Sequence, residues 1–86
     1  MVIGKVVDNV VSTRKHEAMH GVKLLVIEPI LGSNDQTFVA ADKIGAGIGE
    51  YVLVTMGAMA RYALDREIPI DAVVVGILDH EPAIKG

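Results

Sequence analysis

The N-terminal segment 2–12 carries apolar residues on both of its alternating faces, and this pattern restricts the fold more than any other feature of the chain. One face holds Val2, Val6 and Val10, and the other holds Ile3, Val7 and Val11. Successive side chains of a strand point to opposite faces, so a strand of this kind is covered on both sides, at least in part. Segment 72–79 is also apolar on both faces.

The chain is too small to cover all of this apolar surface by itself. It has 86 residues, of which 51% are hydrophobic, and it has no cysteine. A domain of this size buries only about 60% of the surface of its unfolded chain. Without disulfides, the excess predicts a cyclic oligomer in which segments 2–12 and 72–79 both take part. An aspartate at Val75 is then expected to bury a charge and to unfold the subunit or break the ring.

Turn residues divide the chain into short apolar runs that are typical of strands. Five strands are predicted, at 2–12, 23–30, 37–42, 51–56 and 72–79. Residues 58–67 predict one short helix, and residues 13–22 a loop with room for one helical turn. We therefore expect an all-β fold, a small five-stranded OB-like barrel formed by residues 1–80, with a tail at 81–86.

Charge and composition argue against nucleic acid and against a membrane. The net charge is −3, and the chain has only two tyrosines, one phenylalanine and no tryptophan to stack on bases. The longest apolar run, 72–78, is far shorter than the about 20 residues of a spanning helix. The N-terminus lacks the basic start of a signal peptide. A cytoplasmic protein is expected.

A zinc-peptidase motif occurs in the wrong context. His16, Glu17 and His20 match H-E-x-x-H, in which two histidines on one helical face bind zinc. Here the match lies in a short connection between two strands, and Gly21 ends it at once. His80 is the only other histidine. We interpret the motif as an accidental surface pair and predict no metal site.

Nothing else in the sequence forms a catalytic constellation. Ser12 and Ser33 lie outside a G-x-S-x-G motif, and there is no cysteine nucleophile. Asp42, Asp71 and Asp79 stand at strand edges, where aspartate usually caps a turn or faces solvent. The sequence predicts neither an enzyme nor a cofactor.

The glycine-rich segment 43–50 is expected to serve assembly. Its G-x-G-x-G spacing and the strand that follows differ from the G-x-G-x-x-G and helix of a nucleotide site. Three alternate glycines predict a crowded backbone, near a subunit boundary or the ring axis. Glu50 is expected to pair with a cation or a backbone N–H across that boundary, with Arg61 and Lys43 as the candidate cations. The predicted interface or pore residues are Gly45, Ala46, Gly47, Gly49, Glu50 and Arg61.

Four blocks in a fixed order resemble the EutN/CcmL family of bacterial microcompartment shell vertex proteins. The blocks are Gly4-Lys5-Val6-Val7 with Thr13-x-Lys15 and Gly21-x-Lys23-Leu24-Leu25, then Asp42-x-Ile44-Gly45-Ala46-Gly47-x-Gly49-Glu50-x-Val52-Leu53-Val54, then Gly57-x-x-Ala60-Arg61, and finally Asp71-Ala72-x-Val74-Val75-Gly76-Ile77-x-Asp79. One departure is Ala58, where many members have serine; the hydroxyl is a possible helix cap worth about 1 kcal/mol.

The resemblance implies a structural protein without chemistry of its own. It implies a homopentamer that closes, at its vertices, a cytoplasmic polyhedral shell built from hexameric facet proteins. It leaves open the compartment type: carboxysome, ethanolamine, propanediol or glycyl-radical. The alternative function is an OB-like module that binds nucleic acid or a small ligand.

Overall fold

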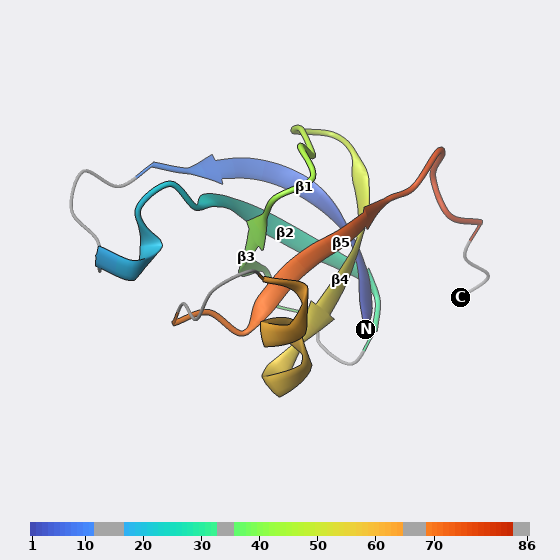
Figure 1. The fold of residues 1–86 in the computed structure, drawn as a ribbon. Coiled ribbons are helices and arrows are strands. Elements are labelled where there is room, and N and C mark those ends of the chain that lie inside the picture. Colours follow the sequence, from blue (N-terminus) through green and yellow to red (C-terminus); the bar gives the residue numbers. More distant parts are fainter. Residues whose placement is uncertain (12–16, 33–35, 65–68, 84–86) are drawn as a thin grey trace.

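The structure is a computed structural model that describes residues 1–11, 17–32, 36–64 and 69–83 (Figure 1). Its elements are β1 (Val2–Val10), η1 (Glu17–Met19), β2 (Lys23–Leu31), β3 (Phe38–Asp42), β4 (Tyr51–Met56), η2 (Gly57–Ala63) and β5 (Ala72–Ile77), where η marks a 3₁₀ helix. Every strand lies within two residues of its predicted bounds.

The five strands close into a barrel in the order β1-β2-β3-β5-β4. Neighbouring strands are antiparallel, except for the parallel pair β3 and β5. β1 completes the barrel by pairing with β4, from Val2 opposite Val54 to Lys5 opposite Tyr51. The predicted all-β five-stranded barrel is confirmed.

The barrel interior is filled by side chains that alternate along the strands. It consists of Val2, Val6, Leu25, Ile27, Ala40, Ala46, Val52, Val54, Ala72 and Val74. Ile3 and Lys5 of β1 take the other face and are only partly buried. The two-faced pattern of the sequence therefore corresponds to one face in the core and one on the outside of the barrel.

Val75 lies on the outside of the barrel, where 38% of its surface is exposed. The pairing of β4 with β5 runs from Leu53 opposite Gly76 to Val54 opposite Val74, so Val75 is an extra residue at a bulge. Such a bulge interrupts the alternation of faces along a strand. An aspartate here would therefore reach solvent in the isolated subunit, so unfolding is not the expected outcome, and the loss of the ring stays a prediction.

η2 covers a second, smaller apolar cluster, formed by Val22, Ala41, Ala60 and Val73. The helix expected at 58–67 is a 3₁₀ helix at 57–63, and residues 65–68 lie outside the described part. Its start is fixed beside β5, because the Gly57 N–H donates to the carbonyl of Asp71 at 2.7 Å. Short connectors of this kind are where 3₁₀ geometry is common.

Gly4 marks the closest approach of β1 to β2. A Cβ atom at this position would overlap Cγ2 of Ile27 and lie 2.9 Å from the carbonyl oxygen of Glu28. The pairing of the two strands also shifts between Ile3 and Gly4. The absence of a side chain at Gly4 thus lets these two strands meet in this register.

Candidate subunit interface

The glycine-rich segment 43–50 is organised by the carboxylate of Asp42 at the end of β3. Its side chain is fully buried. Oδ1 accepts hydrogen bonds from the N–H groups of Ile44 (3.0 Å) and Gly45 (3.2 Å), and Oδ2 accepts one from Ala46 (2.7 Å). Of the two roles expected for this aspartate, capping a turn or facing solvent, the structure shows the first, and the cap shapes half of the loop.

Lys23 of β2 completes this arrangement from the neighbouring strand. It stands opposite Asp42 in the β2–β3 ladder, and its Nζ lies 3.3 Å from Oδ2. The same Nζ donates a hydrogen bond to the carbonyl of Ala46. Because the Lys23 side chain is 46% exposed, water screens the ion pair, and the backbone hydrogen bonds of Asp42 contribute more to stability.

The second half of the segment is attached to β1. The Gly49 N–H donates to the carbonyl of Val6 at 2.8 Å, and the Val6 N–H donates to the carbonyl of Glu50 at 2.9 Å. These bonds extend the β1–β4 pairing beyond β4. The loop is thereby fixed at one end of the barrel, away from η2 (Figure 1).

Glu50 closes a tight turn inside its own loop. Its Oε1 accepts a hydrogen bond from the Gly47 N–H at 2.7 Å, and its N–H donates to the Gly47 carbonyl at 3.1 Å. Glu50 thus already binds a backbone N–H within the subunit. Its pairing with Arg61 or Lys43 across a boundary stays a prediction, and the Arg61 side chain lies outside the described part of the structure.

The glycines of the loop are needed for backbone conformation. Gly45 and Gly49 have φ values of 92° and 93°, which side chains rarely allow, whereas Gly47 has no positive φ. Among the described residues, nothing lies within 4 Å of a Cβ built at Gly45 or Gly49, and at Gly47 the nearest atom is Glu50 Oε1 at 3.4 Å. The expected crowding does not arise within the subunit, and crowding by a neighbouring copy stays a prediction.

Replacing Gly45 with alanine should lower the free energy of unfolding by about 1–2 kcal/mol, because the side chain strains a backbone at positive φ. Gly76→Ala is the control, because Gly76 lies in β5 without positive φ and has room for a Cβ, so its cost should be smaller than that of Gly45→Ala. Urea denaturation at one fixed protein concentration measures both. Equal losses in the two variants would contradict this explanation of the glycines.

Two large apolar side chains on this anchored loop face solvent. Ile44 is 49% exposed and Ile48 is 59% exposed. Exposing them on a fixed loop is unfavourable in an isolated subunit, so the loop is a candidate contact surface.

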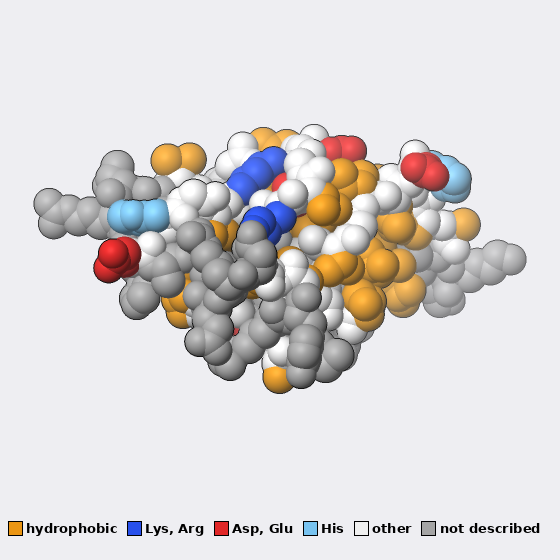
Figure 2. Space-filling model, viewed as in Figure 1, with side chains coloured by type: hydrophobic (Ala, Val, Ile, Leu, Met, Phe, Trp, Pro, Cys, Tyr) orange, Lys and Arg blue, Asp and Glu red, His pale blue; other side chains and the backbone are white. Residues whose placement is uncertain are grey.

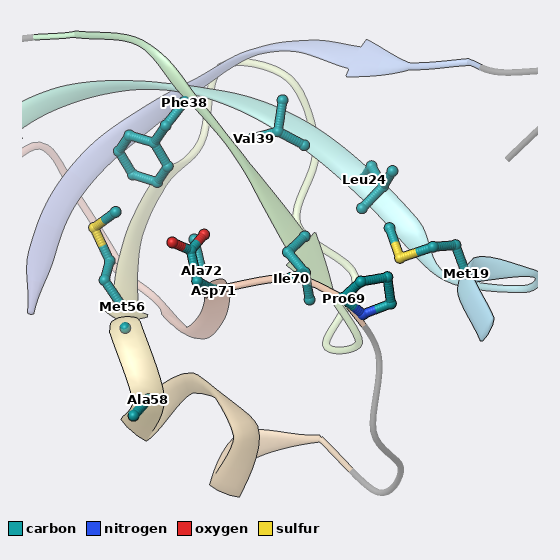
Figure 3. A pocket seen from close by; sticks show the side chains of 11 residues that line it. Met19, Leu24, Phe38, Val39, Met56, Ala58, Pro69, Ile70, Asp71 and Ala72 are labelled. Atoms are coloured by element: carbon teal, nitrogen blue, oxygen red, sulfur yellow. The ribbon is translucent and has the colours of Figure 1, made fainter. Parts of the chain in front are cut away.

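An open apolar groove of about 820 Å³ lies beside η2 (Figure 3). Its walls include Met19 from η1, Leu24 from β2, Val39 from β3, Met56 from β4 and Ile70 before β5. Among the described residues that line it, only Asp71 is charged. No sequence pattern indicates this groove, because the residues that line it are far apart in the chain.

The described residues include neither a candidate metal cluster nor a helix that could span a membrane. They contain no group of three His, Asp or Glu side chains that could hold a metal ion. Glu17 begins η1 and His20 follows it, whereas His16 of the H-E-x-x-H motif lies outside the described residues. No helix in the described ranges has the length and apolar character required to cross a bilayer.

Comparison with known proteins gives consistent matches over nearly the whole chain. Residues 1–79 match the family described as ethanolamine utilisation protein EutN/carboxysome. The shell vertex protein GrpN of Rhodospirillum rubrum is 45% identical over 83 residues, which cover 92% of this chain and 93% of GrpN. The carboxysome shell vertex protein CcmL of Synechococcus elongatus is also 45% identical, over 92% of this chain and 84% of CcmL.

The chain is also similar to a solved structure over nearly its whole length. The pentameric microcompartment shell protein GrpN of Rhodospirillum rubrum superposes with a TM-score of 0.80 at 42% identity, covering 96% of this chain and all of that one.

Proposed function

Because the chain belongs to the EutN/CcmL family, we propose that it closes a polyhedral shell by meeting hexameric facet proteins at the vertices. The chain is a pentameric shell vertex protein of bacterial microcompartments, located in the shell within the cytoplasm. The family is structural and not enzymatic. This function replaces the OB-like binding module that the sequence left as an alternative.

The observation that carries the proposal is the match to the solved GrpN pentamer along 96% of this chain. The subunit also has the surface expected of a ring component. It exposes 5641 Å², against about 4,900 Å² for a compact monomer of 9.1 kDa. Hexameric units alone tile a flat sheet, which cannot close into a polyhedron. A closed shell therefore needs a fivefold unit at each corner, and a ring of five at that place would be surrounded by hexameric neighbours.

We propose that the loop from Asp42 to Tyr51 lies at the boundary between subunits or at the ring axis. The loop residues concerned are Gly45, Gly47, Gly49 and Glu50, and Arg61 of η2 would meet them from the neighbouring copy. Ala46, also predicted for this surface, packs in the barrel interior of its own subunit. Support comes from the exposed isoleucines of the loop and from its attachment at both ends, which presents them in one fixed geometry. Residues 1–80 would form the folding unit, with 81–86 as a tail beyond the family match, which ends at residue 79.

Native mass spectrometry of the full chain should give a single assembly near 45 kDa, five times 9.1 kDa. Gly47→Val should lose this ring at micromolar concentration while the subunit stays folded by circular dichroism, because the Gly47 backbone accepts a side chain without positive φ. A wild-type monomer would refute the ring. An assembled Gly47→Val variant of unchanged stability would refute the role of the loop.

A further inference from the structure

The chain stays beside β4 after β5 has ended. The Leu78 N–H donates to the carbonyl of Tyr51 at 2.9 Å, which continues the β4–β5 pairing beyond Val52 opposite Ile77. From there residues 78–83 leave the barrel as a segment that is neither helix nor strand (Figure 1). We call residues 78–83 the C-terminal arm. Its first residue is therefore bound to the first residue of β4.

The side chain of Tyr51 holds the arm at a second point. Its hydroxyl donates a hydrogen bond to the carboxylate of Glu81. Leu78 and Pro82 are half-buried, whereas the residues between Leu78 and Pro82 are exposed. Figure 2 shows acidic and histidine side chains together at the end of the molecule where the arm lies. One residue of β4 thus binds the arm through both its backbone and its side chain.

Charged groups from β1 and from the arm face Tyr51. Lys5 of β1 pairs with Tyr51, and its Nζ lies 5.7 Å from the centre of the ring. Glu28 of β2 stands opposite Lys5 in the next ladder. Partial burial of Tyr51, its hydrogen bond to Glu81 and repulsion of the phenolate by the same carboxylate raise the pKa of the tyrosine. The hydroxyl therefore keeps its proton at neutral pH and remains a donor to Glu81.

Tyr51 also follows the glycine-rich segment directly. The carbonyl of Glu50 accepts the Val6 N–H, and the carbonyl of Val6 accepts the Gly49 N–H. These bonds attach the end of the loop to β1, which pairs with one edge of β4, while the arm continues from β5 along the other edge. Tyr51 thus lies between the arm and the last hydrogen bonds of the loop.

We propose that Tyr51 is a clamp that couples the C-terminal arm to the glycine-rich segment 43–50. Ends of strands open by local unfolding, and each contact made there lowers the fraction of time that they are open. With the clamp closed, the arm and the loop are held on opposite edges of one strand end. Loss of the hydroxyl contact releases the arm, and the hydrogen bonds between the loop and β1 then open more often. The clamp lies within one subunit, so it does not depend on the ring.

Tyr51→Phe and Glu81→Ala each remove one partner of the side-chain contact. Amide hydrogen exchange at neutral pH, followed by NMR on the full chain, should become faster in either variant by about twofold or more at Leu78, Val6 and Gly49. The double variant should exchange no faster than the single variants, because both substitutions act through one bond. Exchange at Leu78 that does not change in either variant would overturn the clamp. Faster exchange at Leu78 alone would overturn its coupling to the loop.

Asp79→Ala is the matched control, because it removes a carboxylate from the same arm and leaves the partner of Tyr51 in place. Its exchange rates should equal those of the wild type. A second measurement is the ultraviolet titration of the phenol in a Tyr62→Phe background, where Tyr51 is the one remaining tyrosine. Adding Glu81→Ala should lower the pKa of Tyr51 toward its ordinary value. A pKa that Glu81→Ala leaves unchanged, or that Asp79→Ala lowers as much, would overturn the assigned contact.

Discussion

Replacing Asp42 with alanine should lower the free energy of unfolding by about 3 kcal/mol. The carboxylate is buried and accepts hydrogen bonds from three backbone N–H groups, of which that of Ala46 is itself buried. A buried donor left without an acceptor costs about 1–3 kcal/mol. Chemical denaturation at one fixed protein concentration measures the loss, because ring formation links stability to concentration.

Two further variants separate the hydrogen bonds of Asp42 from its ion pair. Asp42→Asn keeps Oδ1 for Ile44 and Gly45 but turns an amide toward the N–H of Ala46, so its loss should be smaller, about 2 kcal/mol. Lys23→Met removes a half-exposed cation and should cost less than about 1 kcal/mol. An Asp42→Ala protein as stable as the wild type would show that the loop holds its shape without the carboxylate.

Replacing Gly4 with alanine should cost about 3 kcal/mol or prevent folding. The added Cβ would overlap the Ile27 side chain and press against the Glu28 carbonyl oxygen. The oxygen belongs to the β2 backbone, so relief requires β1 and β2 to move apart. Overpacking of a well-packed interior typically costs about 1–3 kcal/mol, and a backbone neighbour places this site at the upper end.

Gly76→Ala is the matched control for Gly4, because both glycines lie in strands of the same barrel. A Cβ at Gly76 would meet only the Leu53 side chain, at ordinary contact distances of 3.5 and 3.9 Å. Its effect on the thermal midpoint should be small beside that of Gly4→Ala. Equal shifts in the two variants would mean that close strand approach is not the role of Gly4.

The strands could be predicted because the residues next to each strand, rather than contacts with distant segments, determine where it begins and ends. Apolar runs such as 51–56 end at glycine or at polar clusters. The pattern along 2–12 is apolar on both faces, so it predicts a strand but not which face enters the core. The bulge at Val75 was not predictable. It depends on how β5 pairs with β4, and a one-residue shift moves a side chain to the other face.

The loop was predicted in part. The sequence indicates that aspartate at a strand edge caps a turn, and Asp42 does so. The reason inferred for the glycines was incomplete, because Gly45 and Gly49 are required by backbone conformation while the strongest crowding falls on Gly4. That crowding arises between β1 and β2, more than 20 residues apart, where sequence patterns carry no signal.

Closure of the barrel also limits how copies of this chain can associate. Each strand pairs with a strand on both sides for part of its length, so none of the five described strands is a free edge from end to end. An open edge would invite strand addition, the route by which sheets grow into fibrils. Barrel closure therefore leaves only short stretches of strand for such addition, which disfavours fibril growth even at the high protein density of a packed two-dimensional coat.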